Sequence, residues 1–126
     1  MKCEMKAKTP FNPTEDVDKV IMALSNMFDY DQLEIGDNYV LITGGKESLL
    51  KLKKSLEKRQ IRNTASKIMI KGAHDGVILF KLNKQAAFCG VVNFSEENIS
   101  PMGEINVKIE VDNVDQFIEW LAPLQD

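Results

Sequence analysis

Apolar and polar residues alternate strictly from Glu104 to Val111, and this alternation constrains the fold more than any other feature of the sequence. A period of two is the spacing of side chains along one face of a β-strand. One face of this strand is therefore expected to be buried and the other to meet water. Residues 2–8 alternate in the same way. We predict a sheet that is covered on one side only, which is typical of antiparallel sheets.

Residues 12–28 carry the signals of a helix that covers this sheet. Asn12 suits the N-cap position, Pro13 suits the first helical position, and Glu15 completes a capping box. The apolar residues that follow recur at helical spacing and share one face of the helix. They are Val17, Val20, Ile21, Leu24 and Phe28.

Three further helices are predicted downstream, each with one apolar face. The first covers residues 46–59, and the second covers residues 61–71 and ends at Gly72. The last helix follows Asp112, which we expect to cap it, and ends before Pro123.

The remaining apolar runs are expected to form strands. Residues 32–36 and 39–43 flank the sequence Gly36-Asp37-Asn38, which is a hairpin signal. Residues 77–80 are continuously apolar, as in a central strand covered on both faces. Residues 88–94 form a second such run.

These elements define one domain spanning residues 1–126. A type I turn is predicted at residues 100–103, just before the last strand. The element order is βαββααβββα. The predicted fold class is α+β, with a mostly antiparallel sheet and helices packed on one face.

The net charge of −3 conceals a strongly basic middle third of the chain. Residues 46–84 hold eleven Lys and Arg against three acidic residues, a balance of +8. Residues 1–45 carry −4 and residues 85–126 carry −7. Such asymmetry suggests an anionic partner, either nucleic acid or a membrane surface. A solvated helix face with cations near the helix C-terminus would produce the same count.

The basic residues of the two central helices are expected to form one belt. In a helix over residues 46–59, the cations Lys51, Lys54 and Lys58 fall within about 60° of each other, opposite the leucines. The next helix is nearly contiguous, so its cations extend the same belt. The candidate phosphate contacts are Lys51, Lys54, Lys58, Arg59, Arg62 and Lys67.

A polar cluster, Asn83-Lys84-Gln85, connects two of the most apolar predicted strands. Lysine offers a point charge for phosphate, while Asn and Gln supply donors and acceptors for bases or 2′-hydroxyls. We count all three as candidate RNA contacts. The alternative is that Asn83 and Gln85 tie down this connection by hydrogen bonds to the main chain. Phe88 could stack on a base, although an aromatic residue at a strand start is more often part of the core.

No catalytic or metal-binding set is recognisable in the sequence. Cys3 and Cys89 lack metal-ligand spacing and are expected to pack as small hydrophobic residues. The single histidine, His74, lies in a turn-like sequence and is expected to be exposed. We therefore expect no enzymatic activity, no cofactor and no metal. Because no apolar run approaches the roughly 20 residues of a membrane span and no secretory signal is recognisable, we expect a cytoplasmic protein without a membrane partner.

The polar cluster belongs to a longer segment, residues 82–94 (LNKQAAFCGVVNF), that resembles the signature of an archaeal family of uncharacterised proteins. This family is described as RNA-binding and as predicted to associate with the exosome. The resemblance covers nearly the whole chain. Its other motifs are Pro13–Asp16, Arg59–Ala65, Ser100–Gly103 and Trp120–Pro123.

The resemblance implies a fold similar to that of the large-subunit ribosomal protein that binds 5S RNA. One position departs from the family pattern, because Ser66 stands where a basic residue is expected after Thr64-Ala65. The neighbouring Lys67 can supply that charge.

Two functions fit these observations. The first is an RNA-binding protein of archaeal RNA processing or ribosome-related machinery, which contacts phosphates through the basic helices. With one Trp and two Tyr, structured or duplex RNA is favoured over a single strand. The alternative is a non-catalytic interaction or scaffold subunit whose basic belt meets an acidic partner or a second copy in a homodimer. In that case the strand at residues 2–8 lies at a sheet edge.

Overall fold

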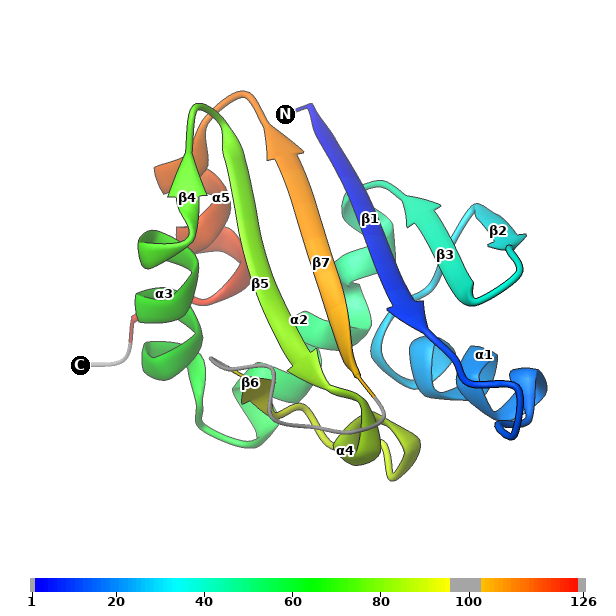
Figure 1. The fold of residues 1–126 in the computed structure, drawn as a ribbon. Coiled ribbons are helices and arrows are strands. Elements are labelled where there is room, and N and C mark those ends of the chain that lie inside the picture. The colour runs from blue at the N-terminus through cyan, green and yellow to red at the C-terminus, as the bar shows by residue number, and fades with distance from the viewer. Residues whose placement is uncertain (1, 96–102, 125–126) are drawn as a thin grey trace.

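An antiparallel sheet is the centre of the computed structural model, which describes residues 2–95 and 103–124. The strands follow the spatial order β2-β3-β1-β7-β5-β4, and β6 also pairs with β5 (Figure 1). Their bounds are β1 (Cys3–Pro10), β2 (Gln32–Ile35), β3 (Tyr39–Gly44), β4 (Ala73–His74), β5 (Val77–Asn83), β6 (Phe94–Ser95) and β7 (Glu104–Val111).

The helices cover one face of this sheet and leave the central part of the other face open (Figure 1). They are α1 (Val17–Met27), the 3₁₀-helix η1 (Lys46–Leu49), α2 (Leu50–Lys58), α3 (Arg62–Lys71), α4 (Lys84–Phe88) and α5 (Val114–Leu121). In the long strands the alternate residues that face the helices are buried, as in Ile105, Val107, Ile109 and Val111 of β7. The fold is therefore α+β with a mostly antiparallel sheet, as the alternation predicts.

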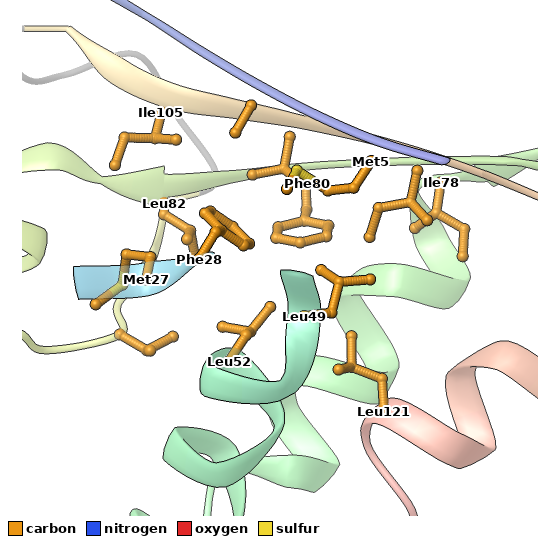
Figure 2. Packing of buried hydrophobic residues seen from close by; sticks show 14 of the residues in the cluster. Met5, Met27, Phe28, Leu49, Leu52, Ile78, Phe80, Leu82, Ile105 and Leu121 are labelled. Carbon is orange, nitrogen blue, oxygen red and sulfur yellow. The ribbon is translucent and has the colours of Figure 1, made fainter. Parts of the chain in front are cut away.

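The core lies between the sheet and the helices. Figure 2 shows Phe80 of β5 and Phe28 at the end of α1 close to the leucines of η1 and α2. Phe28, Leu49 and Leu52 are fully buried. Complete burial of a side chain of this size contributes roughly 1.5–3 kcal/mol. This packing fixes α2 with its leucines inward and, consequently, its lysines outward.

The predicted element order is confirmed, with three short additions. These are β4, η1 and α4. The hairpin prediction is also confirmed, since β2 and β3 pair with Leu33 opposite Ile42. Helix α3 ends at Gly72, as expected.

The predicted strand over residues 88–94 is wrong except at Phe94. Residues 84–88 form α4, because the Asn83 side chain accepts a hydrogen bond from the Ala86 amide at 2.9 Å and caps the helix. The strand β6 begins only at Phe94. The expectation that residues 77–80 are covered on both faces is also wrong, since Leu79 is 55% exposed on the open face.

The helix caps are shifted from their predicted positions. Asp16, rather than Asn12, caps α1 by accepting from the Asp18 amide at 3.0 Å. The expected contact between Glu15 and the Asn12 amide does form, at 2.9 Å, but it closes a turn ahead of the helix. Asn113, rather than Asp112, caps α5.

The expectations about the sheet edge, the thiols and the histidine also have clear outcomes. Strand β1 is not at an edge, because it pairs with β3 on one side and β7 on the other. Cys89 is exposed rather than packed, whereas Cys3 is half-buried and His74 is exposed as predicted. The predicted turn at residues 100–103 lies outside the described residues except for Gly103.

Candidate nucleic-acid interface

Helix α2 presents lysines on the side opposite its buried leucines. Leu52 and Leu56 are fully buried, while Lys54 and Lys58 are exposed. Neither lysine forms an ion pair within residues 2–95 and 103–124. Two like charges four residues apart on a helix destabilise it by about 0.2–0.5 kcal/mol. Their exposed ammonium groups are therefore positioned to gain from an anionic partner.

Lys51 belongs to the same side of α2 but is engaged within the protein. Its ammonium group donates to the Ser25 carbonyl at 2.9 Å and lies 3.2 Å from Asp29 Oδ1. Both side chains of this ion pair are about half exposed, so the pair adds little stability. Lys51 thus links α2 to the end of α1, and only part of its charge is open to a partner.

The next cations lie at the α2–α3 junction and on α3. Arg59, at the C-cap of α2, and Lys67, on α3, are exposed. Arg62 is half-buried, and its buried Nε has no hydrogen-bond partner among the described residues. Ser66 is 3% exposed, so the position where a basic residue is expected points inward. Lys67 carries the charge on the outward side.

Lys46 and Lys53 lie over the ring of Trp120, at 4.6 and 5.7 Å from its centroid. Trp120 is half-buried and packs against Phe117 of α5. These contacts join α5 to η1 and α2. Cation–π contacts at exposed sites contribute about 0.5–1 kcal/mol. No spacing in the sequence indicates this cluster, because its members come from distant segments.

The polar cluster has a structural role in this conformation. Asn83 caps α4, and its backbone amide donates to the Asn93 carbonyl at 2.7 Å. Lys84 is fully buried and donates to the Pro10 carbonyl at 2.6 Å and to Glu15 Oε1 at 3.2 Å. Of the three, Gln85 alone is exposed. Asn83 therefore holds this connection by a hydrogen bond with the main chain, which is the alternative considered above. Lys84 is buried and does not reach the surface.

Phe88 is half-buried and packs against the core, as expected for an aromatic residue in this segment. In the β2–β3 hairpin, the Tyr39 hydroxyl donates to Glu34 Oε2 at 2.9 Å, and this hydrogen bond raises the pKa of Tyr39.

Across residues 2–95 and 103–124, no group of three or more His, Cys, Asp or Glu side chains could hold a metal ion. None of the described helices is long and apolar enough to cross a membrane.

Comparisons with known proteins place this chain in a family. A family model described as RNA binding matches residues 4–111. The chain is 43% identical over 120 residues to the UPF0201 protein of Methanothermobacter thermautotrophicus, covering 95% of this chain and 91% of that protein. It is 38% identical over 117 residues to a UPF0201 protein of Saccharolobus solfataricus, with 88% and 81% covered. The chain thus belongs to the archaeal UPF0201 family.

A solved structure supports the same assignment. The UPF0201 protein from Methanococcus jannaschii superposes with a TM-score of 0.83 at 34% identity, covering 98% of this chain and 95% of that one. The resemblance of the sequence to an archaeal family with an RNA-binding description is therefore confirmed.

Proposed function

We propose that this protein binds RNA through the outward side of α2 and α3. The observation that carries the proposal is a set of exposed cations that make no ion pair within the described residues. They are Lys54, Lys58, Arg59, Lys67 and Lys71. The description of the matching family model supports the same partner.

The placement of these cations supports contact with phosphates rather than with bases. Lys54 and Lys58 lie one helical turn apart on α2, and Lys67 and Lys71 are spaced in the same way on α3. Rows of this kind can follow a charged backbone, and each contact releases counterions. The rows carry no aromatic side chain, and the nearest tryptophan, Trp120, already lies under two lysines. Structured or duplex RNA, recognised by shape, suits such a surface better than a single strand.

The proposed role is that of a non-catalytic, cytoplasmic module in archaeal RNA processing or ribosome-related machinery. An exosome-associated role and a likeness to the 5S-RNA-binding ribosomal protein belong to this proposal. Within the surface, the main contacts are Lys54, Lys58, Arg59, Lys67 and Lys71. Lys51 and Arg62 contribute less because they are engaged or half-buried. Gln85 lies apart on α4, and Lys84 takes no part.

Titration with duplex RNA over a range of salt concentrations tests this proposal. The variant Lys54→Glu/Lys58→Glu is compared with Lys2→Glu/Lys19→Glu, which makes the same charge change at exposed positions outside α2 and α3. We expect binding to weaken in the first variant, with the salt slope reduced by about one for each lost phosphate contact. The control should bind as the wild type does.

Two results would contradict the proposal. One is an absence of salt-dependent RNA binding by the wild-type protein, which would favour the scaffold alternative. The other is equal weakening in the two variants, which would show that total charge rather than this surface matters. Competition by single-stranded RNA of equal length tests the preference for a duplex.

A further inference from the structure

The open face of the sheet carries charges in rows that run across the strands. In one row Glu4 of β1 lies directly opposite Glu110 of β7. Two residues along, Lys6 lies directly opposite Lys108. All four side chains are about half exposed and point away from the helices. The open face thus has an acidic row beside a basic row.

Strand β5 continues both rows with apolar residues. Val77 pairs with Glu110, and Leu79 pairs with Lys108. Leu79 is 55% exposed, although it lies in the middle of a long central strand. Three neighbouring strands therefore present the pairs Glu4/Lys6, Glu110/Lys108 and Val77/Leu79, each spaced by two residues.

This pattern is unfavourable for an isolated sheet. Like charges directly opposite each other on neighbouring strands are destabilising, and opposite charges in the same positions are favourable. Exchanging Lys6 and Glu4 on one strand would give two favourable cross-strand pairs. The present arrangement instead relies on contacts along each strand, at 4.0 Å for Lys6–Glu4 and 3.3 Å for Lys108–Glu110. Surface pairs of this kind contribute little.

We propose that the open face binds a second copy of this chain, with a two-fold axis that runs across the strands between the two rows. Such an axis places each strand over the same strand of the partner, in the opposite direction. The basic row then faces the partner's acidic row, and the acidic row faces the partner's basic row. Leu79 faces the partner's Val77 by the same symmetry. These six residues are therefore self-complementary in charge and in their apolar contact, as a two-fold interface requires, although the same axis places Lys8 over the partner's Lys2.

The expected size of the interface is small. Strands lie about 4.8 Å apart and rise about 3.4 Å per residue, so the face of β3, β1, β7 and β5 over eight residues covers on the order of 500 Å². A standard interface buries about 800 Å² per partner. The dimer should therefore be weak, and it should dissociate in high salt because charge pairs dominate it.

This interface leaves most of the proposed RNA surface free, although Lys71 at the end of α3 lines a hollow together with Leu79 of the open face. The helices lie on the other side of the sheet, so α2 and α3 remain outward in the dimer (Figure 1). The dimer proposal is therefore tested without RNA, so its failure would not bear on RNA binding.

The test is charge complementation between two variants of the full chain. The variant Lys6→Glu/Lys108→Glu makes both rows acidic, and Glu4→Lys/Glu110→Lys makes both rows basic. Sedimentation velocity at high protein concentration and low salt measures the mass of each variant, of the wild type and of an equimolar mixture. We expect a dimer for the wild type, a monomer for each variant and a dimer for the mixture.

A second pair of variants keeps the test decisive if a charge variant does not fold. Leu79→Lys should weaken the dimer. Met22→Lys on α1 should not, because Met22 lies on the other side of the sheet. The two positions are matched, since both are exposed by about half. A wild type that remains monomeric at every concentration would overturn the proposal. So would a wild-type dimer that persists in Leu79→Lys, or a mixture of charge variants that stays monomeric.

Discussion

Replacing Lys84 with methionine should strongly destabilise the protein without weakening its interaction with RNA. The Lys84 ammonium is fully buried, 3.0 Å from Glu15 Oε2, and donates to the Pro10 carbonyl at 2.6 Å. The Glu15 side chain is 10% exposed and also accepts from the Asn12 amide at 2.9 Å. The ion pair therefore ties α4 to the segment between β1 and α1.

The magnitude follows from what the substitution leaves behind. Methionine fills a similar volume, so the main loss is the pairing of a nearly buried carboxylate. Breaking a buried ion pair by removing one partner costs about 3–5 kcal/mol. The residual exposure of Glu15 favours the lower end, about 3 kcal/mol. A typical domain has only about 5–15 kcal/mol of unfolding free energy, so the loss is a large fraction.

A double-mutant cycle isolates the pair. Glutamine at position 15 retains an acceptor for the Asn12 amide but carries no charge. The double variant Lys84→Met/Glu15→Gln should therefore recover about 2 kcal/mol of the loss, because no buried charge remains unpaired. Urea unfolding followed by circular dichroism measures each variant, and the slope with urea concentration should stay constant while the midpoint shifts.

Measuring duplex RNA binding by the same variants can refute this account of Lys84. If Lys84→Met leaves the urea midpoint unchanged yet weakens binding to duplex RNA, then Lys84 must leave Glu15 and contact the RNA. That result would restore the sequence-based prediction of Lys84 as a phosphate contact.

Two further predictions concern the thiols and a glycine. Cys89 is exposed, whereas burial raises the pKa of the half-buried Cys3, partly offset by Lys46, so a thiol reagent should label Cys89 first and Cys3 only at higher pH. Equal rates in peptide mapping would contradict this. Gly72→Ala should destabilise the protein by at least about 2 kcal/mol, because the added Cβ would clash with the Leu79 backbone carbonyl. Gly90→Ala is the matched control and should cost only about 1 kcal/mol, since Gly90 has φ +74° but open space around it.

The sequence predicts the fold class and most elements because those depend on local periodicity. The alternation in β7 and the apolar stripe of α5 each reflect burial of one face, and both are found in the structure. The caps are less predictable because neighbouring polar residues compete for them. Asp112 and Asn113 are adjacent and both suit an N-cap, and the backbone path selects Asn113.

The predicted strand at residues 88–94 shows where local reasoning fails. The run is apolar and prone to form a strand, but the Asn83 cap begins α4 just before it, and contacts distant in sequence hold α4 in place. Asn26 of α1 donates to the Ala87 carbonyl at 2.9 Å, across 61 residues of sequence. Glu15 reaches Lys84 across 69 residues. The sequence therefore predicts a binding motif in this segment, whereas the structure engages its lysine in the interior.

The basic third of the chain divides its charges between internal and external partners. Lys51 and Lys84 pair with Asp29 and Glu15 of the acidic N-terminal third, and two other lysines cover Trp120 in the C-terminal third. The charge asymmetry of the sequence is thus partly a means of holding the three thirds together. Five exposed cations of α2 and α3 remain unpaired for RNA, rather than eleven, and Lys51 and Arg62 contribute less. At about 0.9 per phosphate contact, seven contacts set an upper limit of roughly six for the salt slope of binding through this surface, and a steeper slope would require cations from another face.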